Sequence, residues 1–236
     1  METPRIRAQM DKHGEAEAED EQPPELFQKS ELTDITLVVE GKELHFAKHP
    51  LMAGSTVFTN MIKGSADTSR LVLDDVPYKD MIMFLECLHP KKLQVITDTN
   101  LDQVASIAHR FKQEGILHRC EEYIFKKFNK TYHSVDKMYP KFFFHLRVAD
   151  KYGMRKALKT GIWSDGIEKA YFSSEDLGRY GSKNTFNGYE NDENFRFLSY
   201  KTKFEILGRR LKVTEEMMNP MSPYETKLYN ILSSNK

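Results

Sequence analysis

Histidine and cysteine are the side chains whose spacing would reveal a metal or nucleophilic site in this sequence. The eight histidines are scattered, and His45 and His49, four residues apart, span the end of an expected strand, where that interval does not place both on one helical face. His118 and Cys120 lack the second half of any zinc pattern. There is no glycine-rich phosphate loop, Gly-x-Ser-x-Gly elbow or His-Glu-x-x-His motif. We therefore predict no catalytic residues, no metal and no cofactor.

Composition narrows the classes of partner. Lys plus Arg equals Asp plus Glu at 35 each, so no overall charge attracts nucleic acid or membrane. Lys126, Lys127 and Lys130 are interpreted as the solvated face of a helix. Cys87 and Cys120 are too few for a disulfide framework and fall on apolar helix faces, which favours core positions in a reduced compartment. With no apolar run near the ~20 residues of a membrane helix and no signal peptide, we expect an intracellular, cytoplasmic or nuclear protein.

The elements that would position any binding surface begin after an acidic segment. Residues 15–25 read EAEAEDEQPPE, with no aromatic or basic residue. Such a stretch cannot bury enough apolar surface to offset its ordering entropy, so residues 1–30 are predicted to be disordered. A solvated extension is favoured, and an acidic interaction tail is the alternative.

Residues 31–128 alternate strand and helix patterns. The expected strands are 35–39 and 43–47, joined through Gly41, with short strands at 70–73 and 93–96. The expected helices are 50–62, 77–88, one that follows a capping box at 99–102, and 116–128. This order predicts an α+β domain in which a small sheet is overlaid by helix pairs.

Residues 129–236 carry no strand pattern and are predicted to be helical, with a loop near 173–194. Helices are expected at 143–152, at 154–158 after Gly153, over 200–211, and from Ser222. Residues 107–111 and 148–152 echo each other before a turn, which favours two helical hairpins. The single tryptophan, Trp163, is interpreted as a packing residue.

Several segments at matching spacing resemble a BTB (also called POZ) domain. Residues 33–39 (TDITLVV) and 43–48 (ELHFAK) resemble its opening, and Leu51, Ala53, Ser55, Phe58 and Met61 match its Leu-x-Ala-x-Ser-x-x-Phe-x-x-Met helix. Residues 73–76 (LDDV) and 119–124 (RCEEYI) resemble a later strand and its last helix. The resemblance covers about residues 31–128, and the helices beyond it loosely resemble the BACK extension of ubiquitin-ligase adaptors.

The resemblance implies a non-enzymatic module that pairs with a copy of itself. The dimer contact is predicted to involve Leu32, Asp34, Lys48, Leu51, Ser55 and Phe58. Apolar side chains that a small domain leaves uncovered would be buried in an interface of about 1,600 Å² or more. Asp34 and Lys48 are either a charge pair partly withdrawn from water, which is costly to split, or two exposed charges that contribute little.

The resemblance also implies a substrate adaptor that docks a cullin-type ubiquitin ligase scaffold and holds an unknown target. The docking residues would be Met61, Ile62, Asp67 in the loop 63–69, Leu88 and His89. That loop lacks the apolar-x-Glu pattern of many ligase-binding members. The alternative is therefore an oligomerisation scaffold in a transcriptional or cytoskeletal assembly.

Overall fold

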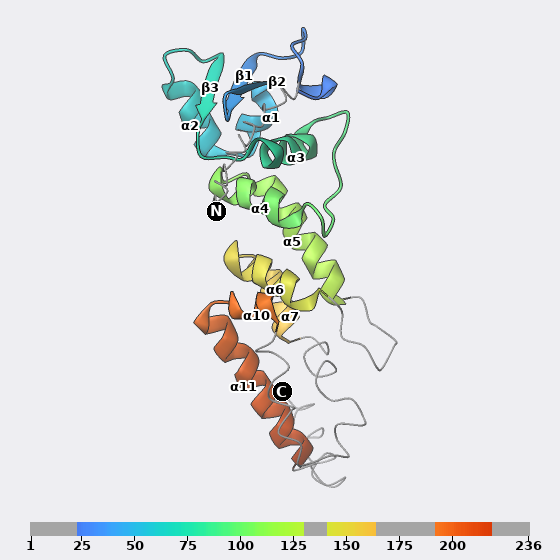
Figure 1. The fold of residues 1–236 in the computed structure, drawn as a ribbon. Helices are drawn as coiled ribbons and strands as arrows, with labels where there is room; N and C mark the ends of the chain where they lie inside the picture. Colours follow the sequence, from blue (N-terminus) through green and yellow to red (C-terminus); the bar gives the residue numbers. More distant parts are fainter. Residues whose placement is uncertain (1–22, 130–140, 164–191, 219–236) are drawn as a thin grey trace, which may run out of the picture.

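A computed structural model describes residues 23–129, 141–163 and 192–218. Three strands form one sheet in the order β2-β1-β3: β1 (Ile35–Val39) pairs antiparallel with β2 (Lys42–Phe46) and parallel with β3 (Arg70–Leu73). Helices follow and carry the chain away from the sheet, so that the molecule is elongated, with the sheet at one end and α11 at the other (Figure 1). The α+β prediction is confirmed.

The predicted hairpin is confirmed and its turn explains its register. Glu40 and Gly41 both have positive φ, 50° and 77°, as a two-residue type I′ turn requires. That turn pairs Val39 with Lys42, so alternate side chains along β1 meet those of β2. The β1 residues are buried apart from Thr36, because β1 is the central strand.

The helix expected over 50–62 is two helices, α1 (Lys48–Ala53) and α2 (Thr56–Gly64). Ser55 interrupts them because its hydroxyl oxygen accepts the Phe58 N–H at 2.9 Å, which caps α2. Gly54 fits closely here, since a Cβ would lie 1.8 Å from the Gln113 side-chain oxygen and would displace that side chain. The break therefore depends on Gln113, more than fifty residues away in the sequence.

Three further helices complete the first region: α3 (Tyr78–Leu88), α4 (Leu101–Arg110) and α5 (Glu114–Asn129). Two predictions here are wrong. Residues 93–96 form a loop, which the Arg119 guanidinium holds by donating to the carbonyls of Cys87 and Gln94. The capping box at 99–102 does not form, because the Asn100 side chain bonds the backbone of Thr97 and Val95 instead.

The two helical hairpins are confirmed and share one turn geometry. Helices α6 (Phe142–Lys151) and α7 (Arg155–Ile162) meet at Gly153, φ 67°, as α4 and α5 meet at Lys112, φ 49°. In both turns an N–H reaches back five residues at 2.8 Å, from Met154 to the Ala149 carbonyl and from Gln113 to the Ala108 carbonyl. The echo in the sequence is thus a repeated helix-ending turn.

The short helices η1 (Glu25–Phe27) and α10 (Glu193–Arg196) and the long helix α11 (Tyr200–Met218) complete the described elements. Phe27 is fully buried within the segment expected to be disordered, so the chain packs against the sheet before residue 31. The expected helix from Ser222 and most of the loop near 173–194 lie outside the described residues.

The main hydrophobic core does not stop at the end of α5. It extends from Phe27 through the sheet and α2–α5 to Val148, Ala149, Tyr152, Met154 and Ala157. A second, smaller core joins the other side of α6 and α7 to α10 and α11 through Phe143, Leu146, Phe195 and Ile206. Helices α6 and α7 therefore share apolar contacts with both parts of the molecule.

Candidate protein-interaction site

Asp34 and Lys48 lie side by side, but their contact is not a charge pair. The Asp34 carboxylate accepts the Lys48 backbone N–H at 2.6 Å, which satisfies the first free N–H of α1. Within the described residues, the Lys48 ammonium makes no ion pair with Asp34. Asp34 is exposed, so its structural effect is that of a helix cap.

The other predicted dimer residues divide into surface and interior. Leu32 is 76% exposed, whereas Leu51, Ser55 and Phe58 are 0%, 2% and 0% exposed within a single chain. Phe58 stacks on Phe111 with ring centroids 4.3 Å apart. In this conformation only Leu32, Asp34 and Lys48 of the predicted set offer side chains to a second molecule.

The first half of the predicted docking surface is the end of α2 and the loop after it. Met61 is half-buried, and Ile62 is 3% exposed and belongs to the core. Asp67 is exposed, but its carboxylate turns back to accept the Ser69 N–H at 2.8 Å and the Ser69 hydroxyl at 2.6 Å. Those hydrogen bonds lower the pKa of Asp67 below its usual range. The Asp67 carboxylate of this loop is thus already hydrogen-bonded to Ser69 of the same loop.

The second half of that surface lies beside the opposite edge of the sheet. His89 packs edge-on against Phe46 at the end of β2 and against Phe27, with centroid distances of 5.9 and 6.4 Å. The loop after α2 leads into β3, on the other side of β1. Leu88 is the last residue of α3 and His89 is its C-cap, and both are half-buried. Figure 1 shows how α2 and α3 lie relative to the sheet. The structure therefore does not bring the five residues into one compact cluster.

A polar cluster around the buried His145, which the sequence analysis missed, joins the first region to the helices beyond it. The Asp98 carboxylate accepts from the Tyr123 hydroxyl of α5 at 2.5 Å and from His145 Nε2 of α6 at 2.8 Å. Lys141 adds an ion pair at 3.3 Å. An ionised carboxylate can only accept, so Nε2 of His145 carries the proton. Only the conjunction of three distant segments reveals this cluster.

Burial and hydrogen bonding act in opposite directions on these groups. Burial lowers the pKa of His145 to about 4, although the Asp98 carboxylate opposes that shift. Burial raises the pKa of Asp98, but the bonds from Tyr123 and His145 outweigh it and bring the pKa to about 2. At neutral pH the pair is thus a neutral imidazole bonded to a carboxylate.

A parallel contact ties α4 to α6. The Asp102 carboxylate accepts from the Arg147 guanidinium at 2.7 Å and from the Tyr152 hydroxyl at 2.8 Å. Arg147 also donates to the side-chain oxygen of Asn194 in α10 at 3.0 Å. Together with the Asp98 cluster, these bonds fix α6 on the first region.

The core positions predicted for the two cysteines are confirmed, whereas the packing role predicted for the tryptophan is not. Cys87 and Cys120 are buried and free, as predicted, and burial raises the pKa of their thiols to about 11 and about 12. The packing interpretation of Trp163 is wrong, because the side chain is 55% exposed at the end of α7. One face of the indole lies under the Arg209 guanidinium of α11, and the remainder of the side chain is open to solvent.

Within 23–129, 141–163 and 192–218, no three His, Cys, Asp or Glu side chains are grouped as metal ligands. None of the helices in those ranges is both long and apolar enough to traverse a bilayer.

Comparisons with known proteins identify the first region. The family profile of the BTB/POZ domain matches residues 24–127. The "BTB and MATH domain-containing protein 36" of Caenorhabditis elegans is 26% identical over 113 residues, which are 47% of this chain and 34% of that protein. This chain thus matches about a third of the length of that relative.

Among solved structures, the BTB (Tramtrack and Bric a brac) domain of human gigaxonin is similar at a TM-score of 0.34 and 18% identity, over 39% of this chain and 77% of that one. BTB/POZ domains are generally protein-interaction modules that self-associate and bind other proteins, and they are typically non-enzymatic. The profile match, with the α+β sheet and helices on which it falls, shows that residues 24–127 of this chain are a BTB/POZ domain.

Proposed function

We propose that this chain is a homodimeric adaptor that joins a cullin-type ubiquitin ligase scaffold to a target protein held by its helical half. The BTB/POZ match over residues 24–127 is the observation that carries the proposal. The core shared across α5, α6 and α7, with the Asp98 and Asp102 contacts, supports it further. An adaptor needs such a rigid connection, because a target on a loose tether would not be oriented toward the ligase.

The dimer is proposed to form around Leu32 and the β1–α1 corner. Leu32 is 76% exposed and lies two residues before Asp34, so an apolar side chain stands beside the capped start of α1. A twofold contact would bury the Leu32 side chains of both subunits, because each subunit contributes the same patch. Light scattering at micromolar concentration is expected to give about twice the chain mass of 27.6 kDa, and a stable monomer would reject the dimer.

Cullin binding is tested with exposed residues, because a change at buried Ile62 would disturb the core. The double variant Lys63→Glu/Asp67→Arg reverses one exposed charge in the last turn of α2 and one in the loop that follows it. The matched control Lys79→Glu/Asp74→Arg makes the same changes at exposed positions in the loop after β3 and in α3. Purified cullin should be retained by the wild type and by the control variant, and it should not be retained by the Lys63→Glu/Asp67→Arg variant. If the wild type and the control variant both fail to retain cullin, the adaptor role is rejected.

The second candidate is an oligomerisation scaffold that ignores the cullin. Two observations favour it: Asp67 is engaged by Ser69, and the residues at α2 and α3 lie beside opposite edges of the sheet. A dimer that shows no cullin retention would support this candidate over the adaptor.

A further inference from the structure

Helices α7 and α11 diverge around a groove that the BTB/POZ domain does not contribute to. Its volume is about 880 Å³, and its walls come from the end of α6, from α7 and from the first three turns of α11. Leu158, Trp163 and Phe204 supply apolar wall, and both aromatic side chains are more than half exposed. An apolar hollow of this size accepts one or two bulky side chains of another molecule.

The charge around this groove is unbalanced. Among the residues that the structure describes, five basic ones line it, against two acidic ones: Arg155, Lys159, Lys201, Arg209 and Lys212 against Asp150 and Glu205. Asp150 is engaged, since its carboxylate accepts from the Ser199 N–H at 2.6 Å and the Thr202 hydroxyl at 2.7 Å and so fixes the start of α11. The whole chain is neutral, so this positive rim is a local feature.

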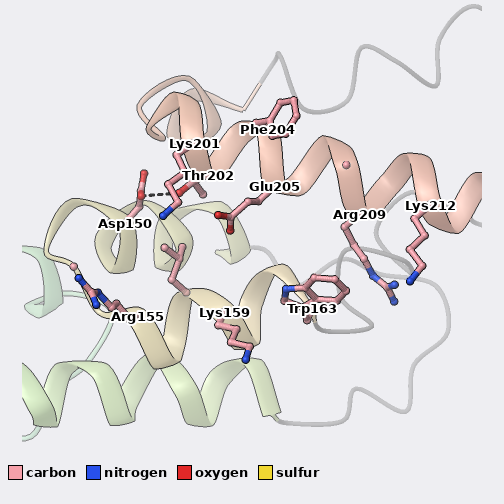
Figure 2. Close-up of a pocket in the computed structure, with 13 residues that line it drawn as sticks. Asp150, Arg155, Lys159, Trp163, Lys201, Thr202, Phe204, Glu205, Arg209 and Lys212 are labelled. Atoms are coloured by element: carbon pink, nitrogen blue, oxygen red, sulfur yellow. Dashed lines mark hydrogen bonds between the residues drawn. The ribbon is translucent and has the colours of Figure 1, made fainter. Parts of the chain in front are cut away.

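Trp163 is the point where the apolar wall and the positive rim meet. The Arg209 guanidinium lies over the indole ring at 5.1 Å from its centroid. Figure 2 shows Arg209 and Lys212 extending from α11 on the side of Trp163, whereas the Lys159 side chain, one turn earlier on α7, points away from α11. A carboxylate bound beside Trp163 would therefore be close to the cations of α11.

We propose that this groove binds an acidic peptide segment of a partner protein, with a bulky apolar side chain between α7 and α11 and carboxylates on the basic rim. Charge complementarity selects this occupant. A nucleic acid fits less well, because Arg209 already covers one face of the only tryptophan and two carboxylates line the path of a phosphate backbone. The inference rests on the proposed function, in which the helical half holds the target.

The single tryptophan makes the test direct, because all tryptophan emission of the full chain reports on this groove. The probe is the peptide Glu-Asp-Glu-Leu-Glu-Asp-Glu, which has no fluorescent side chain. We expect a saturable shift of Trp163 emission that weakens when salt screens the charges. The peptide with Ala in place of Leu should bind several-fold more weakly, and the one with Lys in place of every acid should not bind.

The variant Lys159→Glu/Lys212→Glu reverses the rim on both helices and should raise the dissociation constant at least tenfold. The control Lys79→Glu/Lys126→Glu makes the same charge change at exposed positions of α3 and α5 and should bind as the wild type does. Equal binding by both variants, no emission change in the wild type, or tighter binding of a single-stranded oligonucleotide would each overturn the proposal.

Acrylamide quenching of Trp163 emission in the free chain is a further test. If acrylamide does not quench this emission, the groove is filled by the chain itself and the proposal is overturned. The titration contains no cullin, so its failure is distinguishable from a failure of the proposed adaptor role. If the chain retains cullin but does not bind the peptide, the proposed peptide groove is rejected and the proposed adaptor role is not.

Discussion

Acidification is expected to weaken the attachment of α6 through one group, His145. Its side chain is 0% exposed, and burial lowers its pKa from 6.5 to about 4. Because the folded-state pKa lies below the unfolded value, the unfolded chain binds more protons between those two pH values. The stabilisation is therefore complete above pH 6.5 and is lost as the pH falls toward 4. About 2.5 pKa units at ~1.4 kcal/mol each correspond to roughly 3 kcal/mol.

The substitution His145→Gln isolates this group from all other titrating residues. A glutamine amide donates a neutral hydrogen bond toward Asp98 and does not titrate, while Asp98, with a pKa of about 2, stays ionised across the window. Urea unfolding followed by circular dichroism gives the free energy of unfolding of both proteins at several pH values. The advantage of the wild type over the variant should shrink by roughly 3 kcal/mol between about pH 7 and pH 4.

That difference cancels the remaining histidines and carboxylates, which both proteins share. A constant difference across the whole pH range would refute the reasoning, because it would mean that His145 is not held neutral by burial. A difference that grows on acidification would show that the folded state prefers the protonated imidazole.

Three further experiments use four substitutions, at Gly54, at Asp34 and Lys48, and at Leu32. Gly54→Ala places a Cβ 1.8 Å from the Gln113 side-chain oxygen and displaces an amide that donates to two carbonyls, so urea unfolding should show a loss of about 2–4 kcal/mol; a neutral result would contradict the packing. Asp34→Ala should cost about 1 kcal/mol as a lost helix cap, whereas Lys48→Ala should stay within ~0.5 kcal/mol; equal large losses would restore the charge-pair interpretation. Leu32→Asp should shift light scattering from dimer to monomer while circular dichroism keeps the folded signal, and an unchanged dimer would move the interface elsewhere.

Local patterns in the sequence were sufficient for most of the elements. The glycine turn at 40–41, the apolar run of β1, the apolar alternation of β2 and β3 and the helical stripes of α3 to α7 each depend on neighbours within a few residues. The repeated helix ends at Phe111 and Tyr152 were visible as an echo for the same reason. The resemblance to a BTB domain rested on those segments and their spacing, and the profile match over residues 24–127 confirmed it.

Burial and long-range polar contacts were decided by the tertiary structure alone. Apolar spacing identified Leu51 and Phe58 as one face of a helix, but only the arrival of Phe111 shows that this face is covered within the chain. Trp163 was interpreted as a packing residue and yet is 55% exposed. Periodicity tells which side chains avoid water, and it cannot tell which distant element removes water from them.

The same distinction holds for charge. The sequence by itself determined a neutral chain, and only the packing of α7 beside α11 gathers five basic side chains around one groove. Asp98 and His145 are 47 residues apart, and their hydrogen bond exists because α6 returns onto the start of α4. Electrostatic effects depend on distance in space and on burial, and a sequence states neither.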